Sequence, residues 1–218
     1  MDRIYNHIDM LITKPATQSL PLARRFLIML GIISIVACIM GLWLLGLLGN
    51  SVRAGYPWII MEPLIAAKQV IPLLISATAI PLLLMLIRPE ARLAGRVVPV
   101  LMSIVIMPIM MLAFLLPVSA YSASQIISAT SVQQCLVTIP IIASPILFAQ
   151  LVILRHGAIT KPVMTGWLAG LAAGGIATAI YALVCTEDNP GFYGLWYSLN
   201  ILFVSFVGAL LGRYSLRW

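Results

Sequence analysis

Six apolar runs, each roughly 20 residues long, restrict the folds open to this chain more than any other feature of its sequence. A helix needs about that length to cross the hydrocarbon layer of a membrane. Only 9% of the residues are charged, whereas soluble domains carry about 25%. The sequence therefore predicts an all-α, polytopic integral membrane protein with six transmembrane helices in one bundle. The runs cover residues 26–48, 70–87, 97–118, 135–153, 163–184 and 194–212.

The lysines and arginines predict how this bundle is oriented, because basic residues concentrate on the cytoplasmic side of membrane proteins. Only Arg53 and Lys68 fall on the outer side. Both termini are therefore expected in the cytoplasm. The same bias explains the net charge of +7, so we expect no direct contact with nucleic acid. The eleven basic residues on the inner side are Arg3, Lys14, Arg24, Arg25, Arg88, Arg92, Arg96, Arg155, Lys161, Arg213 and Arg217.

This orientation divides the chain into three parts. They are a cytoplasmic N-terminal segment at 1–25, a six-helix membrane domain at 26–212 and a cytoplasmic tail at 213–218. In the outer loop at 49–69, the sequence around Trp58 predicts a short helix at headgroup depth. Glu62 and Lys68 of this loop are expected to be solvated.

Glycines and prolines predict how the helices pack and bend. Small residues at every fourth position let helix backbones approach closely in lipid, and the fifth and sixth runs both carry them. Prolines inside the second to fourth runs are expected to kink those helices. The glycines are Gly166, Gly170, Gly174, Gly208 and Gly212, and the prolines are Pro72, Pro81, Pro99, Pro108, Pro140 and Pro145.

Two cysteines are expected at the outer ends of neighbouring helices. Cys135 opens the fourth run and Cys185 closes the fifth, and the short loop between these runs makes them antiparallel neighbours. The thiols should lie at similar depth, within reach of a disulfide. With Glu187 or Asp188 they could also hold a soft metal ion. A permanent bridge and a switchable pair both fit the pattern, whereas Cys38 falls in mid-run as a small apolar residue.

The N-terminal segment has one amphipathic stretch, at residues 2–13. Its apolar stripe consists of Ile4, Ile8, Leu11 and Ile12, and Pro15 ends it. A helix here could rest on the inner leaflet of the membrane, or it could offer its apolar face to a cytoplasmic partner. The residues alone leave both interpretations open.

The interiors of the six runs lack ionisable side chains, which argues against a carrier coupled to protons or ions. The chain also lacks the common catalytic and nucleotide-binding motifs, so we expect no enzyme and no cofactor. Two alternatives remain: a thiol–disulfide oxidoreductase of the membrane that faces the periplasm, and a transporter of small molecules or metals. The two histidines, His7 and His156, lie on the inner side, away from the cysteines.

The last third of the chain carries four distinctive motifs. They are Thr165-Gly-Trp-Leu-Ala-Gly-Leu-Ala-Ala-Gly-Gly, Tyr181-Ala-Leu-Val-Cys-Thr-Glu-Asp, Trp196-Tyr197 and Gly208-Ala-Leu-Leu-Gly-Arg-Tyr-Ser-Leu-Arg-Trp218. These motifs resemble those of the NrsF family, six-helix inner-membrane proteins of proteobacteria named as negative regulators of sigma F. Where that family commonly has His-Cys-Pro-Glu-Asp, this chain has Val184-Cys185-Thr186-Glu187-Asp188.

The resemblance implies a membrane-bound anti-sigma factor in the bacterial inner membrane. Such a protein holds an extracytoplasmic-function sigma factor at the cytoplasmic face. It releases that partner when periplasmic cysteines, here Cys135 and Cys185, meet heavy-metal or oxidative stress. The resemblance also favours residues 1–25 as the sigma-binding surface, with Ile4, Ile8, Leu11 and Ile12 as apolar anchors.

Overall fold

The computed structural model describes residues 19–47, 52–53, 55–56, 58–87, 97–115 and 129–216, and within these ranges the chain is helical and has no strand. This confirms the all-α prediction for the described residues. The elements are α2 (Ser19–Leu47), the 3₁₀ turn η2 (Trp58–Met61), α3 (Pro63–Leu86), α4 (Val98–Leu115), α6 (Ala129–Leu154), α7 (Pro162–Ala182) and α8 (Pro190–Ser215).

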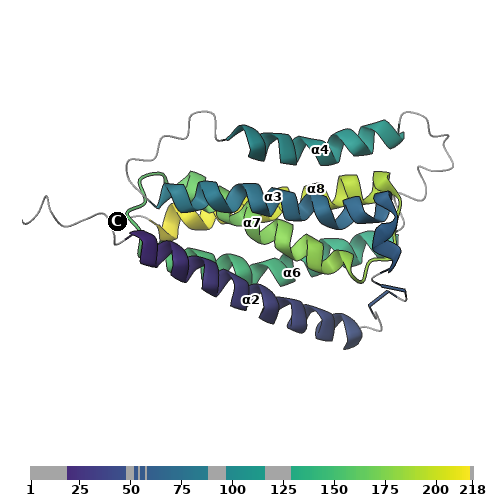
Figure 1. The fold of residues 1–218 in the computed structure, drawn as a ribbon, viewed down its shortest axis with the longest axis horizontal. Helices are drawn as coiled ribbons and strands as arrows, with labels where there is room; N and C mark the ends of the chain where they lie inside the picture. Colours follow the sequence, from purple (N-terminus) through teal and green to yellow (C-terminus); the bar gives the residue numbers. More distant parts are fainter. Residues whose placement is uncertain are drawn as a thin grey trace, which may run out of the picture.

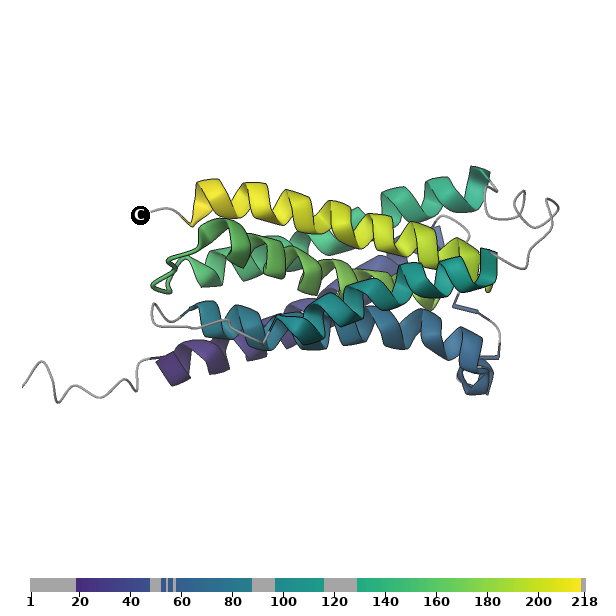
Figure 2. The same ribbon diagram turned by 90° about the horizontal axis from the view of Figure 1, so that it is seen from above.

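The long helices lie side by side in an elongated bundle and alternate in direction along the chain (Figure 1 and Figure 2). The start of α2 and the end of α8 therefore lie at the same end of the bundle. Arg24, Arg25, Arg155, Lys161 and Arg213 also belong to this end, because they stand where these helices start or stop there. We call it the basic end. The opposite end carries η2 and the connection between α7 and α8.

Among the described residues, five helices are long and apolar enough to cross a membrane, judged by length and composition. They are Ala23–Trp43, Pro63–Leu86, Ser131–Leu154, Pro162–Ala182 and Pro190–Ser215. The described part of α4 is 18 residues long and is not among them. Four helices also begin several residues before the apolar runs that predicted them, because α2 starts at Ser19, α3 at Pro63, α6 at Ala129 and α8 at Pro190. A helix continues past the apolar layer as long as its backbone hydrogen bonds are made.

Proline sets the start of three of these helices. α3, α7 and α8 each carry proline in the first turn, where the missing N–H has no intrahelical partner to lose. At α8, the Asn189 side chain also accepts a hydrogen bond of 2.8 Å from the Gly191 N–H. Pro99 is the second residue of α4 and lies in its first turn, so the prediction that it kinks the helix was wrong. The prolines inside helices are Pro72, Pro81, Pro108, Pro140 and Pro145.

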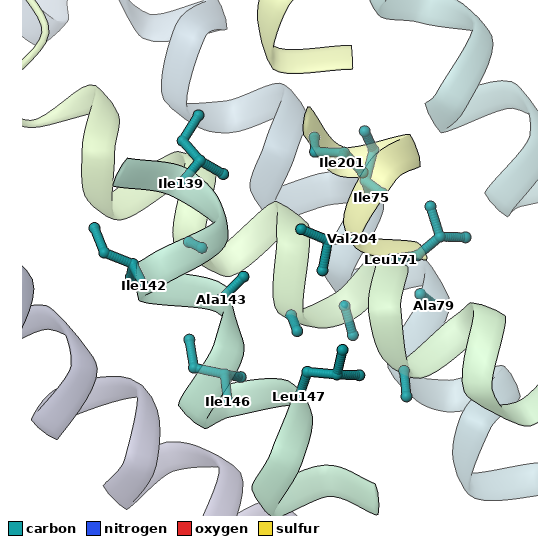
Figure 3. Close-up of a cluster of buried hydrophobic side chains, with 14 of the residues drawn as sticks. Ile75, Ala79, Ile139, Ile142, Ala143, Ile146, Leu147, Leu171, Ile201 and Val204 are labelled. Atoms are coloured by element: carbon teal, nitrogen blue, oxygen red, sulfur yellow. The ribbon is translucent and has the colours of Figure 1, made fainter. Parts of the chain in front are cut away.

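Helix α7 lies at the centre of the bundle. It packs against α2, α3, α6 and α8, and 78% of its span is buried, against 22% for the span in α2. Figure 3 shows part of the core around it, where apolar side chains of α3, α6, α7 and α8 gather, among them Ile75, Ile146, Leu171 and Val204. The outer faces of the surrounding helices expose large apolar residues instead, among them Ile35, Met40 and Phe203. Apolar groups both inside and outside are what a bundle in lipid requires.

The predicted close approach of the glycine-bearing helices is confirmed. A methyl group added to Gly166 of α7 would overlap the carbonyl oxygen of Gly208 in α8 and come within 2.9 Å of the Gly212 Cα. One added to Gly170 would come within 2.5 Å of the Ser205 Cα. The backbones of α7 and α8 are therefore in direct contact, and α7 behaves as a rigid partner of α8.

Candidate functional site

Cys135 and Cys185 both lie toward the end of the bundle opposite the basic end, which we call the thiol end. Cys135 belongs to α6 and is fully buried. The sequence had indicated that Cys135 opens this helix. Since α6 begins at Ala129, Cys135 lies inside the helix instead. Cys185 follows the end of α7, and its N–H donates to the Tyr181 carbonyl at 3.1 Å. Its side chain is buried as well, with 7% exposed.

The two thiols are near enough to interact electrostatically with each other. Both are free, as is the half-buried Cys38 in α2. Proximity is what a disulfide or a shared metal ion would need, and the bridge itself stays a prediction.

Three polar side chains surround this pair. The rings of Tyr181 and Tyr197 meet edge to face with centroids 6.2 Å apart, and both tyrosines interact with both cysteines. Asn200 of α8 donates from Nδ2 to Cys135 Sγ at 3.6 Å and to the Trp196 carbonyl at 2.9 Å. We call Cys135, Tyr181, Cys185, Tyr197 and Asn200 the thiol cluster. It joins α6, α7 and α8.

Two atoms of the thiol cluster are buried without a hydrogen-bond partner, the Tyr197 hydroxyl and Asn200 Oδ1. The Tyr197 hydroxyl lies near the Cys185 thiol. Leaving a buried polar group unpaired costs about 1–3 kcal/mol, so these two atoms lower the stability of the cluster in this arrangement.

Lys68 of α3 fixes the backbone that carries Cys185. Its ammonium group donates to the carbonyls of Cys185 at 2.5 Å and Glu187 at 2.9 Å, and it lies 3.3 Å from Asp188 Oδ1. Only 1% of this residue is exposed, so the expectation that Lys68 is solvated was wrong. Because α3 starts at Pro63, Lys68 lies on its second turn and packs under the 183–189 connection. Glu62 is exposed, as expected.

Arg53 reinforces this attachment from the preceding loop. Its guanidinium pairs with Asp188 at 2.6 Å, and its N–H donates to the Leu183 carbonyl at 3.4 Å. Lys68, Arg53 and Asp188 together form an ion-pair clamp around the connection between α7 and α8.

The sequence prediction missed this clamp and the polar neighbours of the thiols, Tyr181, Tyr197 and Asn200. The sequence held one signal for the clamp. The two cations expected on the outer side, Arg53 and Lys68, share that side with the adjacent carboxylates Glu187 and Asp188.

The two carboxylates proposed as metal ligands have other partners here. Asp188 is held in the ion-pair clamp, and Glu187 accepts a hydrogen bond of 3.0 Å from Ser131. Among the described residues, no three His, Cys, Asp or Glu side chains stand close enough together to hold a metal ion. A site made of both thiols and a carboxylate is therefore not preformed. The predicted sigma-binding residues, Ile4, Ile8, Leu11 and Ile12, lie outside the described residues.

A small cavity opens beside Cys185. Its volume is about 50 Å³, and it lies between the start of α6, the end of α7 and the connection to α8. Its lining residues are Leu45, Ser131, Gln134, Tyr181, Val184, Cys185, Thr186 and Glu187.

Comparison with known proteins decides which family this arrangement belongs to. The family model described as "Negative regulator of sigma F", NrsF, matches residues 13–218, almost the whole chain. The chain belongs to the NrsF family. The bundle, the buried thiols and the ion-pair clamp described above are thus features of an NrsF-family protein.

Two curated members of the NrsF family are similar to part of the chain. The "Probable anti-sigma-F factor NrsF" of Azospira oryzae is 38% identical over 86 residues, which are 39% of this chain and 40% of that protein. The "Anti-sigma-F factor NrsF" of Caulobacter vibrioides is 35% identical over 97 residues, 44% of this chain and 45% of that protein. The chain thus spans less than half the length of either relative in these alignments. No solved structure matches it.

Proposed function

We propose that this protein is a membrane-bound anti-sigma factor that binds an extracytoplasmic-function sigma factor at the cytoplasmic face of the bacterial inner membrane. The thiol cluster controls release of that partner under heavy-metal or oxidative stress. The observation that carries the proposal is the family match over 13–218, since its relatives are named as anti-sigma-F factors. The geometry adds a buried pair of thiols whose polar neighbours are incompletely bonded.

The charge distribution supports an orientation with the basic end in the cytoplasm. The five described cations of the basic end contrast with only Arg53 and Lys68 at the thiol end, both of which pair with Asp188. The thiols then face the periplasm, where oxidised cysteines persist. A reporter fused after Trp218 tests this, because an active periplasmic reporter there would contradict the orientation.

Coupling between the two membrane faces, from the thiol end to the basic end, rests on the contact of α7 with α8. Cys185 lies in the connection between these helices, and Cys135 reaches α8 through Asn200. A new bond at the thiols would shift the outer ends of α6, α7 and α8, and the direct contact of the α7 and α8 backbones would carry the shift inward. A bias of about 1.4 kcal/mol between two arrangements changes their ratio tenfold.

Replacing both cluster cysteines tests this control. In a Cys135→Ser/Cys185→Ser variant we expect sigma-dependent transcription to stay repressed when cadmium or an oxidant is added, because serine forms neither a disulfide nor a soft-metal bond. A transcriptional reporter measures this with and without the stress, and Cys38→Ser is the matched control that should respond like wild type. If the double variant is induced like wild type, the thiols are structural and the proposed control is wrong.

Removing the N-terminal segment tests the proposed partner. A segment this short has no core of its own and is expected to order on its partner. Deleting residues 2–18, which precede the first described residue of α2, should leave the sigma factor constitutively active while the bundle still inserts. The same reporter measures the activity, and membrane fractionation verifies insertion. Persistent repression by the inserted variant would place the binding surface in the loops of the basic end.

A further inference from the structure

We propose that the cavity beside Cys185 is the route by which a small, uncharged or cationic thiol-reactive species enters the thiol cluster. Such a species meets Cys185 before Cys135, and Glu187 keeps anions out. The inference rests on the proposed function, because it gives an order and a selectivity to the same two thiols.

The order of reaction follows from which thiol lines the cavity. Cys185 is part of the lining and Cys135 is not. Cys135 is 0% exposed, and its sulfur is held by the Asn200 amide on the side of α8. A reagent must contact the sulfur to react with it. Cys135, which Cys185 influences electrostatically, therefore reacts second.

A peroxide would convert the Cys185 thiol to a sulfenic acid and leave as an alcohol or water, and the Cys135 thiol would then displace hydroxide from that sulfur, forming the disulfide and water. A metal ion bound by Cys185 would instead gain Cys135 as a second ligand, each thiol losing its proton.

The size of the cavity limits what can enter. One water needs about 10–15 Å³ of such space, so a cavity of about 50 Å³ holds only a few water-sized groups. A metal ion or a molecule of a few heavy atoms fits this space. A peptide thiol does not fit, which separates this cavity from the open site that an oxidoreductase would need for a protein substrate.

The charge of the cavity comes from Glu187, the one charged side chain among the described residues that line it. The hydrogen bond from Ser131 holds this carboxylate at the cavity. The two nearest cations of the thiol end, Lys68 and Arg53, are bound to Asp188 and are not part of the lining. An anion that enters the cavity thus meets a carboxylate in the lining, whereas the excess positive charge of the clamp, two cations against Asp188, lies outside the lining on the carbonyl side of Cys185.

The order is tested by alkylation of the purified protein. In a Cys38→Ala background only the two cluster thiols remain. With iodoacetamide, a small uncharged reagent, we expect Cys185 to be alkylated roughly tenfold faster than Cys135, by mass spectrometry of timed samples. The rate at Cys185 in a Cys135→Ser variant should be unchanged. Equal rates, or faster alkylation of Cys135, would overturn the proposed order.

The charge selectivity is tested with iodoacetate, which resembles iodoacetamide in size but is an anion. Glu187→Gln keeps an acceptor for Ser131 and removes the charge. We expect this variant to raise the iodoacetate rate at Cys185 roughly threefold at low salt, the scale of a partly exposed charge, and to leave the iodoacetamide rate unchanged. Glu62→Gln, which removes an exposed carboxylate outside the cavity lining, is the matched control and should alter neither rate. A Glu187→Gln variant that changes both rates equally would show that Glu187 acts through the fold and would overturn its role as a charge filter.

These measurements separate the inference from the proposed function, because they need no sigma factor. If alkylation shows the expected order and charge selectivity but sigma-dependent transcription does not change when the thiols are replaced, the route stands and the proposed function fails. If transcription depends on the thiols but Cys135 reacts first, the route is wrong and the proposed function stands.

Discussion

Replacing Gly166 by valine is expected to prevent the bundle from assembling. The added Cβ would overlap the Gly208 carbonyl oxygen and lie 2.9 Å from the Gly212 Cα. Both of these atoms belong to the backbone of α8, so no side-chain rotation can relieve the contact. Ordinary overpacking in a core costs about 1–3 kcal/mol of stability. Because two whole helices must separate here, we expect the free energy of unfolding to fall by an amount at or above that range. Because α7 is the central helix, the loss extends to the packing of α3 and α6.

Thermal unfolding in detergent measures this effect, with size-exclusion chromatography as a check on assembly. Gly31→Val is the matched control, since a Cβ at Gly31 in α2 meets no atom within 4 Å. That variant should unfold close to the wild-type temperature. If Gly166→Val is as stable as Gly31→Val, the two helix backbones are not in contact at this position and the central role of α7 is wrong.

The sequence predicted those parts of the fold that depend on local properties. Apolar length is local, and it located the helices because each must be long enough to cross a membrane. The spacing of Gly166 and Gly170 is also local, and it identified the two helices with touching backbones. Helix starts were less accurate, because a helix that has left the apolar layer continues until its capping residues end it. For α3 and α8 the N-cap residues are Glu62 and Asn189, and a proline follows each in the first turn.

The site was predicted only in part, because burial of a polar group depends on partners that are distant in sequence. Depth along the helices brought Cys135 and Cys185 to one end of the bundle. It could not show that Asn200 faces Cys135, since that contact depends on the rotation of α8 about its axis. Lys68 was taken for a solvated residue for the same reason. Its partners lie more than a hundred positions further along the chain.

Replacing Lys68 by methionine is expected to release the segment that carries Cys185. Methionine has a similar length but donates no hydrogen bond, so the carbonyls of Cys185 and Glu187 lose their buried donor. Breaking a buried ion pair by removing one partner costs about 3–5 kcal/mol. Asp188 keeps Arg53, and its side chain is 32% exposed, so we expect the lower part of that range for the local opening of the thiol end. With the segment freed, iodoacetamide should alkylate Cys185 roughly tenfold faster than in the wild type. This increase in rate should be larger than the increase at Cys135.

Lys68→Arg and Asp188→Asn distinguish a specific clamp from a general loss of stability. Arginine keeps the positive charge and several donors, so it should recover much of the slow wild-type alkylation of Cys185. Adding Asp188→Asn to Lys68→Met should cost less than the sum of the two single changes, since both remove the same ion pair. In the proposed function, loosening this segment biases the bundle toward release, so Lys68→Met should raise sigma-dependent transcription without any added stress. Unchanged alkylation at Cys185 in Lys68→Met would mean that the ammonium group does not hold the segment. Faster alkylation with normal repression would mean that movement of the segment alone does not release the sigma factor, and that a new bond at both thiols is required.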